Sequence, residues 1–457
     1  PLIIRMETIV AHRKYPYAAI HAPRMPYYVR MGKFDSKNKR SKAPARDRLW
    51  SASFILIIAS TLCCFMVGQG LNSSTSVYVA LYGGSAAYAG VLAAVFSGAA
   101  AVMRLLSGPL IDERGRRIVM LAGFLVLIVG TIGPLFTHDV VPFVIFRFLQ
   151  GTGFSAATTA SATAAADALP SSRMGEGIGY YGLGQAIAMS IGPAFALALV
   201  STDPAENLFI GATAAAALGL ALIFFCCYEK HPETLPEEAV YRREREEKRT
   251  RSEGAKGEEA RREGFISRIF EKRALPGTLP TLVIAPAFGF VIFFVGLYGT
   301  SLGVGNAGLF YTLSAVSMVI VRLKSGAFMD RFAPIKILPV ALAFGVVAFA
   351  MLIACGTVLD GSPARDAVFY LAGIVYGPCI GIVNPLNQAV AVKNTPPERW
   401  GAANALFQLA IDVGIGCASV IWGLVNDSFG FPVTICCVIC CAVASYFVAR
   451  AVYPKED

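Results

Sequence analysis

The chain has 457 residues, of which 55% are hydrophobic and only 15% are charged. Soluble globular domains carry about 25% charged residues, and here the charges are also unevenly spread. Residues 1–48 and 229–276 together hold 25 of the 40 Lys and Arg residues and 15 of the 30 Asp and Glu residues. The remaining sequence is too apolar for a soluble core, which excludes a soluble protein and predicts a membrane protein.

The net charge of +10 raises the alternative of a nucleic-acid-binding protein. The basic excess lies mainly in residues 1–48 and in short loops, rather than along one face of a folded domain. Anionic lipid headgroups next to a cytoplasmic tail are the simpler source of counter-charge. We therefore expect contact with the lipid bilayer and no contact with nucleic acid.

Apolar runs long enough to cross a bilayer recur twelve times along the chain, six before the charged stretch 229–276 and six after it. They cover residues 52–80, 86–107, 118–137, 140–167, 175–201, 207–228, 279–300, 305–325, 337–358, 366–391, 401–424 and 430–451. The sequence thus predicts an all-α membrane protein with twelve transmembrane helices, arranged as two bundles of six.

The charges in the short loops predict the orientation of these helices. With both termini in the cytoplasm, the cytoplasmic loops receive nine Lys or Arg residues and the outer loops receive only Arg365. This asymmetry follows the positive-inside rule, and an odd number of spans in either half would destroy it. We expect a multi-pass protein of the cell (inner) membrane with both termini in the cytoplasm.

These patterns divide the chain into four parts. They are a basic cytoplasmic tail (1–48), a first six-helix bundle (49–228), a charged cytoplasmic linker (229–278) and a second six-helix bundle (279–453). The linker interleaves basic and acidic residues at helical spacing and is too polar to bury. We expect a solvated helix or a disordered segment that tethers the two bundles.

All eleven cysteines fall within apolar segments, which is not the pattern of a disulfide framework. Four of them are spaced at one helical turn and could hold a soft metal ion: Cys436, Cys437, Cys440 and Cys441. No histidine or carboxylate accompanies these four, so packing within a helix is the preferred interpretation. We expect no metal and no cofactor, and nothing in the sequence resembles an enzyme site or a nucleotide-binding loop.

The two halves of the chain share a repeated motif. Its copies are Arg104-Leu-Leu-Ser-Gly108-Pro-Leu-Ile-Asp112 and Arg322-Leu-Lys-Ser-Gly326-Ala-Phe-Met-Asp330. Both copies end the second span of their half and enter a cytoplasmic loop. Duplicated six-span halves are a known design of secondary transporters, whose substrate site lies near mid-membrane between the halves. The repeat therefore predicts two pseudo-symmetric bundles that transport a solute by alternating access.

The loop after the first copy carries the most specific motif. The run Gly108-Pro-Leu-Ile-Asp112-Glu-Arg114-Gly115-Arg116-Arg117 resembles the loop 2–3 signature of the major facilitator superfamily. The likeness to this family covers nearly all of residues 50–453. It implies that the motif is a conformational gate, and that Gly326, Asp330 and Arg331 form its degenerate second copy.

Each residue of the first copy has an expected role. Gly108 would let two helices approach closely, and Asp112 would face the N-terminus of a neighbouring helix. Gly115 would permit the turn, while Arg116 and Arg117 would hold the loop in the cytoplasm. The family usually has a basic residue after the Asp, where this chain has Glu113.

Two further motifs extend the resemblance. The fourth span contains Arg147-Phe-Leu-Gln150-Gly151, similar to a signature of proton-coupled members of the family. A cation within the membrane usually faces a cavity or a partner, and the alternative is that Arg147 snorkels to the outer surface. The fifth span contains Gly192-Pro193, which resembles the helix kink of antiporters in this family, and a simple kink is the alternative.

Asp412 is the one acidic residue deep within a span, about midway along the eleventh. All four histidines lie outside the spans, which argues against a histidine relay. A carboxylate at this depth can take up a proton in one state and release it in the other, or it can bind a cationic substrate. A structural pairing with Arg147 or with a polar neighbour is the remaining alternative. We expect Asp412, together with Arg147, to couple transport to protons.

Polar and aromatic residues in the gating helices are candidates for the substrate cavity. Any one of them is more often a packing residue or an interhelical hydrogen bond. As a set they indicate a mixed pocket, which favours an amphiphilic or weakly cationic solute over a polyanion. The candidates are Gln69, Asn72, Gln150, Tyr181, Gln185, Tyr298, Tyr376, Asn384, Asn387 and Gln408.

The expected function is proton-coupled efflux of drugs or small metabolites, because residues 175–183 look like the fifth span of bacterial exporters of this family. An importer or uniporter of a small nutrient, such as a sugar or an organic acid, is the nearest alternative. A non-transporting membrane receptor or scaffold that docks through the linker is a further one. One chain holds both halves of a cavity, so we expect a monomer that binds protons and a small molecule.

Overall fold

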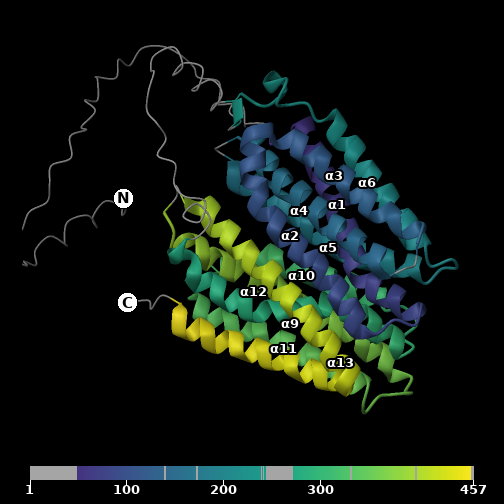
Figure 1. Ribbon diagram of the computed structural model, residues 1–457. Coiled ribbons are helices and arrows are strands. Elements are labelled where there is room, and N and C mark those ends of the chain that lie inside the picture. The colour runs from purple at the N-terminus through teal and green to yellow at the C-terminus, as the bar shows by residue number, and fades with distance from the viewer. Residues whose placement is uncertain are drawn as a thin grey trace, which may run out of the picture. The chain divides into compact units, whose positions relative to one another are not determined.

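The computed structural model describes residues 49–137, 140–170, 173–237, 239, 241–242, 271–329, 332–396 and 399–453. The basic tail 1–48 and residues 243–270 of the predicted linker lie outside these ranges. The described part of the chain is almost entirely helical (Figure 1), apart from one isolated β-bridge between Pro170 and Ala239.

Six long helices make up the first half. They are α1 (Ala52–Leu81), α2 (Ala86–Arg114), α3 (Arg116–Ile132), α4 (Val140–Asp167), α5 (Met174–Val200) and α6 (Asn207–Phe225). α1 and α2 each begin after a serine, because the hydroxyls of Ser51 and Ser85 accept the backbone N–H of Phe54 and Tyr88, both at 3.1 Å. These helices follow the six predicted spans to within a few residues.

The second half contains α9 (Leu275–Ser301), α10 (Gly308–Met329), α11 (Pro334–Cys355), α12 (Ala364–Lys393) and α13 (Trp400–Val452). With 53 residues, α13 is too long for one span, and its backbone departs from helical geometry at Gly430 (φ 79°). Glycine adopts this φ without strain. The predicted break between residues 424 and 430 is therefore a single residue, and the twelve predicted membrane helices are present.

The contacts between helices repeat from one half to the other. In the first half, α1 packs against α5 and α6, and α4 packs against α2 and α3. In the second half, α9 packs against α13 and accepts a hydrogen bond from each of its two spans, through Trp422 and Ser445, and α12 packs against α10 and α11. Helices at equivalent positions thus make equivalent contacts, which confirms two pseudo-symmetric bundles. The halves meet through α2 with α13, α5 with α10, and α1 with α9 (Figure 1).

An even number of spans puts the start of α1 and the end of α13 at the same end of the helices, which we call the terminal face. The loop charges predict that this face is cytoplasmic. We call the opposite end, which holds the loop 82–85 and Gly430, the distal face.

The two halves are joined by hydrogen bonds near the distal face. The Asp427 carboxylate of α13 caps α2, since it accepts the backbone N–H of Ala86 at 3.0 Å and of Ala87 at 2.8 Å. The Ser419 hydroxyl donates to the Gly90 carbonyl at 3.1 Å, between the same two helices. Between α1 and α9, the Ser76 hydroxyl donates to a carbonyl of α9 at 2.6 Å. The halves are therefore packed together at this end.

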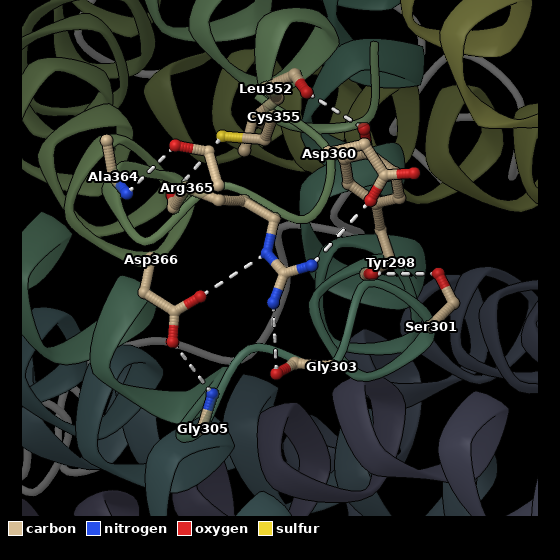
Figure 2. A network of polar contacts seen from close by, with 11 residues as sticks. Tyr298, Ser301, Gly303, Gly305, Leu352, Cys355, Asp360, Ala364, Arg365 and Asp366 are labelled. Carbon is tan, nitrogen blue, oxygen red and sulfur yellow. Dashed lines mark hydrogen bonds and ion pairs between the residues drawn. The ribbon is translucent and has the colours of Figure 1, made fainter. Parts of the chain in front are cut away.

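Arg365, the one basic residue predicted for the outer loops, ties the distal loops of the second half together (Figure 2). Its Nη2 donates to the Gly303 carbonyl at 3.3 Å, and its Nε lies 3.4 Å from Asp366 Oδ1. Asp366 in turn accepts the backbone N–H of Gly305 at 3.2 Å, and Asp360 lies 3.7 Å from Arg365 Nη1. This network holds the loop between α9 and α10 against the start of α12.

Candidate functional site

An ion pair within the membrane-spanning region joins the two halves. Arg104 Nε of α2 lies 2.7 Å from Asp412 Oδ2 of α13, and the two side chains are 15% and 18% exposed. At a rise of about 1.5 Å per residue, Arg104 is about 27 Å from the start of α2 and Asp412 about 18 Å from the start of α13. Among the residues that the structure describes, this is the one ion pair between the halves.

The partner of Asp412 differs from the one considered in the sequence. A structural pairing with Arg147 is wrong, because Asp412 pairs with Arg104. Sequence reasoning noticed Arg104 only as the first residue of the repeated motif. A signal was available, since Arg104 is a cation inside a predicted span, where a partner or a cavity is expected.

Arg147 is the centre of a buried polar cluster inside the first half. Its side chain is 1% exposed, so snorkelling to the outer surface is wrong. Nη1 donates to Gln150 Oε1 at 2.8 Å, Nη2 donates to Asn72 Oδ1 at 2.7 Å, and the guanidinium carbon lies 4.7 Å from the centre of the Phe96 ring. Within the described ranges no carboxylate pairs with Arg147. The cluster satisfies the cation with amides and an aromatic ring instead.

This cluster joins α1, α2, α3 and α4. Gln150 is fully buried, and its Nε2 donates to the Gly130 carbonyl of α3 at 2.8 Å. Arg147 and Gln150 lie on α4, Asn72 on α1 and Phe96 on α2. Three predicted site residues, Arg147, Gln150 and Asn72, are thus brought together, and their bonds are made within one half of the protein.

The loop between α2 and α3 at the terminal face is capped from a distant segment. Gly115 has a φ of 88°, which fits the turn expected there. The Glu229 carboxylate accepts the backbone N–H of Arg116 at 2.8 Å and of Arg117 at 3.0 Å, so Glu229 caps the N-terminus of α3. The sequence analysis missed Glu229, because it assigned the role of a helix-dipole partner to Asp112.

The two arginines of this loop are held by neighbouring groups. Arg116 Nε lies 2.7 Å from Asp167 Oδ2 at the end of α4. Arg117 Nη2 donates to the Phe224 carbonyl of α6 at 2.7 Å, and its guanidinium lies 5.8 Å from the centre of the Phe224 ring. Both side chains therefore fix the loop against the ends of other helices in the same half.

Other parts of the gate motif require a correction or lie outside the described residues. Among the described residues, no neighbouring heavy atom lies within 4 Å of the position that a Cβ on Gly108 would take, so the close helix approach expected at Gly108 is not found in that part of the chain. Arg114 lines a pocket of about 170 Å³ between α2, α3 and α4. Gly326 lies within α10, whereas the side chain of Asp112 and the residues Asp330 and Arg331 lie outside the described part.

The segment that follows α6, from Tyr228 into the first residues of the predicted linker, packs against the terminal face of the first half. Tyr228 is 1% exposed, and its hydroxyl donates to Asp167 Oδ2 at 3.3 Å. Burial, followed by the nearby Asp167 carboxylate, raises the pKa of Tyr228, which keeps the phenol protonated as a donor. Leu235 and Ala239 are also buried. This part of the linker is docked, in contrast to the expected solvated segment.

The Gly192-Pro193 motif lies inside a continuous helix, α5. A Cβ on Gly192 would lie 2.7 Å from the Met66 carbonyl oxygen, and a Cβ on Gly70 would lie 2.9 Å from the Gly192 carbonyl oxygen. These glycines therefore let α1 and α5 approach closely.

Two predicted cavity residues are bonded within the second half. The Tyr298 hydroxyl donates to the Leu352 carbonyl at 2.9 Å (Figure 2), and its ring packs against Phe431. Asn387 is fully buried, and its Oδ1 accepts a hydrogen bond from the Tyr453 hydroxyl. Both side chains thus join helices of the same bundle.

The remaining candidates fall into two groups. In the first group, the Tyr376 hydroxyl and Asn384 Oδ1 are buried without a hydrogen-bond partner among the described residues, as is Nδ2 of Asn387. The Tyr181 hydroxyl is buried near Thr61 and Gln185. Gln69 and Gln185 are half-buried, and Gln408 is exposed.

The cysteines at one-turn spacing do not form a ligand cluster with other side chains. Cys436 and Cys440 are exposed, and Cys437 and Cys441 are half-buried. Within the described ranges, no group of three or more His, Cys, Asp or Glu side chains is arranged to hold a metal ion.

Comparison with known proteins matches this architecture. In solved structures, the chain is similar to a D-xylose-proton symporter, with a TM-score of 0.67 and 14% identity over 88% of this chain and 98% of that one. It is also similar to a nucleoside transporter, with a TM-score of 0.66 and 15% identity over 88% of this chain and all of that one. At these identities, the likeness establishes the fold alone.

Sequence comparison gives the family. The chain is 24% identical to the staphylopine export protein of Staphylococcus aureus over 397 residues, which cover 83% of this chain and 90% of that protein. It is 20% identical over 389 residues to an uncharacterised transporter of Methanocaldococcus jannaschii, covering 82% of this chain and 92% of that protein. The family model of the Major Facilitator Superfamily matches residues 49–384. The chain therefore belongs to the Major Facilitator Superfamily and is a multi-pass membrane transporter of a small molecule.

Proposed function

We propose that the protein is a proton-coupled exporter of small solutes, in which Asp412 is the protonation site. The observation that carries this proposal is the ion pair between Arg104 and Asp412, which joins the two halves within the membrane-spanning region. A carboxylate in this position can report its protonation state to both halves at once. The named export function of the staphylopine relative supports the direction.

The pair links protonation to the arrangement of the halves. Ionised Asp412 attracts Arg104 and stabilises the contact between α2 and α13, which are also joined at the distal face by Asp427 and Ser419. A proton on Asp412 removes the Coulombic attraction and leaves at most a neutral acceptor for Arg104. Protonation thereby favours separation of the two helices, and deprotonation favours the arrangement described above.

The orientation of the helices, the loop between α2 and α3, and Arg147 are consistent with a proton-coupled transport cycle. With the terminal face in the cytoplasm of an inner-membrane protein, a proton enters from outside in the distal-open state and leaves to the cytoplasm in the distal-closed state. Glu229, Arg116 and Arg117 keep the gate loop fixed while the halves rock. Arg147 holds the first half rigid in this proposal, rather than carrying the proton. A single chain contains both halves and acts as a monomer.

The test is transport in inside-out membrane vesicles with an imposed pH gradient, screened with a library of labelled solutes. Acidification of the lumen should drive uptake by the wild-type protein. Asp412→Asn should reduce gradient-driven uptake about tenfold or more. Glu176→Gln is the matched control, because Glu176 is 46% exposed and pairs only at the surface with Arg173. Gradient-driven uptake that persists in Asp412→Asn contradicts the proposal, and uptake in the opposite direction supports an importer.

A further inference from the structure

We propose that the transported solute is a zwitterion, whose acidic group binds Arg104 and whose ammonium group binds Asp412. This inference rests on the proposed function, because it places the solute on the carboxylate that the proton uses. It names a substrate class that differs from the amphiphilic or weakly cationic solute expected from the sequence.

The first argument is the accessibility of the two charges. Arg104 and Asp412 keep 15% and 18% of their side-chain surface exposed, whereas Arg147 is 1% exposed and fully engaged by Gln150, Asn72 and Phe96. The pair also lies between the halves, where transporters built from two repeats bind their substrates. Arg104 and Asp412 are therefore two charges that a solute can reach, whereas Arg147 is not.

The second argument is the bonding capacity that the pair leaves unused. Arg104 uses only Nε to bind Asp412 Oδ2. Within the described part of the chain, its two terminal nitrogens and Asp412 Oδ1 have no other hydrogen-bond partner. Two terminal nitrogens of a guanidinium form a planar fork that matches a carboxylate or a similar acidic group. The free oxygen of Asp412 can accept an N–H of an ammonium group.

The third argument is the charge balance when a solute enters between the two side chains. A cationic solute would pair with Asp412 and leave Arg104 as an uncompensated cation in a medium of low dielectric constant. An anionic solute would pair with Arg104 and leave Asp412 uncompensated. A zwitterion supplies one partner for each side chain, so both charges remain paired while the ion pair between the halves is broken.

This arrangement also explains exchange of solute for proton. The ammonium group and a proton compete for the same Asp412 carboxylate, so binding of one releases the other. Occupancy by either ligand breaks the attraction between Arg104 and Asp412, which permits the halves to rearrange. Neither ligand needs to act at a second site for transport to be coupled.

The test is binding to the purified full-length protein in detergent at pH 7, without a gradient, measured as the ligand-induced shift in melting temperature. Three pools with matched side chains serve as probes: amino acids and dipeptides as zwitterions, their C-terminal amides as cations, and their N-acetyl derivatives as anions. The zwitterion pool should raise the melting temperature of the wild-type protein by about 2 °C or more at saturation, and the other two pools should not.

Variants of Arg104 and Asp412 test whether the shift in melting temperature depends on the ion pair. Arg104→Gln and Asp412→Asn should each abolish the response to zwitterions, and the double charge exchange Arg104→Asp with Asp412→Arg should restore part of it. Arg173→Gln is the control, because Arg173 lies at the terminal face and pairs with Glu176. If a neutral variant does not fold, the response of the charge-exchange variant and of the other single variant decides the question.

The outcomes separate this inference from the proposed function. A response to the cation or anion pool alone, no response to any pool, or a response to zwitterions that persists in both neutral variants overturns the inference. Proton-driven export of a purely cationic solute would leave the proposed function intact and overturn the inference. Binding of zwitterions that depends on both charges, without any proton-driven transport, would support the inference and overturn the proposed function.

Discussion

Asn72 Oδ1 accepts a hydrogen bond from Arg147 Nη2 at 2.7 Å, which joins α1 to α4 in the middle of the first half. Both residues are buried, at 4% and 1% exposure. A buried guanidinium without a carboxylate partner depends on neutral acceptors and aromatic rings for its stability. The Asn72 amide is therefore a structural requirement of Arg147, and the two residues act as a unit.

The first prediction concerns this hydrogen bond. Asn72→Leu keeps the volume but leaves an Arg147 N–H buried without an acceptor, which should cost about 1–3 kcal/mol of stability. Asn72→Asp keeps an acceptor and adds a charge opposite to that of Arg147, so it should lose less stability than Asn72→Leu. Thermal unfolding of the purified variants in detergent measures the order.

Gln69 is the control for this prediction, since it lies about one turn from Asn72 on α1 and is half-buried. Gln69→Leu removes no hydrogen bond of the described residues and should change stability by no more than about 0.5 kcal/mol. Equal losses in Gln69→Leu and Asn72→Leu would mean that the Arg147 hydrogen bond does not matter for stability.

The second prediction concerns the cap of α3. Glu229 accepts the first two backbone N–H groups of that helix, so Glu229→Ala should destabilise the protein by about 1 kcal/mol, and Glu229→Gln by less. Hydrogen exchange should quicken at the start of α3 and not in α5. Glu233→Gln is the control, because Glu233 is exposed and pairs with His231 at the surface. A larger effect of Asp112→Asn than of Glu229→Ala would transfer the capping role to Asp112.

The membrane helices could be predicted because the hydropathy of a span depends on its own residues and not on the helices that pack against it. The fourth span, predicted as residues 140–167, coincides with α4. The break in α13 was predicted to within a few residues, because Gly430 and Pro432 disrupt regular helix in any context. Hydropathy and helix-breaking residues act over short stretches of sequence, so the bounds of the helices could be predicted from the sequence alone.

The partners of charged residues were not predictable in the same way. The pairing of Arg104 with Asp412 depends on which helices meet between the halves and on the rotation of α2 and α13 about their axes, and neither is encoded in local composition. Glu229 caps α3 only because the chain turns back after α6. The small size of Gly108 suggested a helix contact, but a glycine pattern does not say which side of a helix meets a neighbour.

The third prediction uses two glycines of α2. A Cβ on Gly90 would overlap the Ser419 carbonyl oxygen, whereas no heavy atom of the described residues lies within 4 Å of a Cβ on Gly98. Gly90→Ala should therefore prevent full closure of the halves at the distal face and reduce transport about tenfold or more. Gly98→Ala should transport at the wild-type rate, because its added methyl group meets open space.

Spin labels at the start of α2 and near Gly430 in α13, both at the distal face, would measure the cause of the Gly90→Ala defect. Their separation should increase in Gly90→Ala and stay unchanged in Gly98→Ala. If both variants lose transport while the label distance stays constant, closure of the distal face is not the step that Gly90 serves.

The fourth prediction concerns pH and stability at the terminal face. Glu271, just before α9, accepts the backbone N–H of Arg273 at 3.1 Å and pairs with Arg399 at 2.9 Å. The backbone hydrogen bond, followed by the one from Arg399, lowers the pKa of Glu271 from its ordinary value of 4.5. A lowered pKa means that ionised Glu271 stabilises the folded protein above pH 4.5, and that this contribution is lost as the pH falls through the lower folded-state value.

The stability difference between wild type and Glu271→Gln should therefore be constant from pH 8 to about pH 5 and should shrink below about pH 4.5. Melting temperatures of both proteins across this range measure the difference. Glu237→Gln is the control, since Glu237 is exposed, and its difference from wild type should stay near zero at every pH. A difference for Glu271→Gln that grows toward low pH would have the wrong sign for a carboxylate held in its ionised form by Arg273 and Arg399.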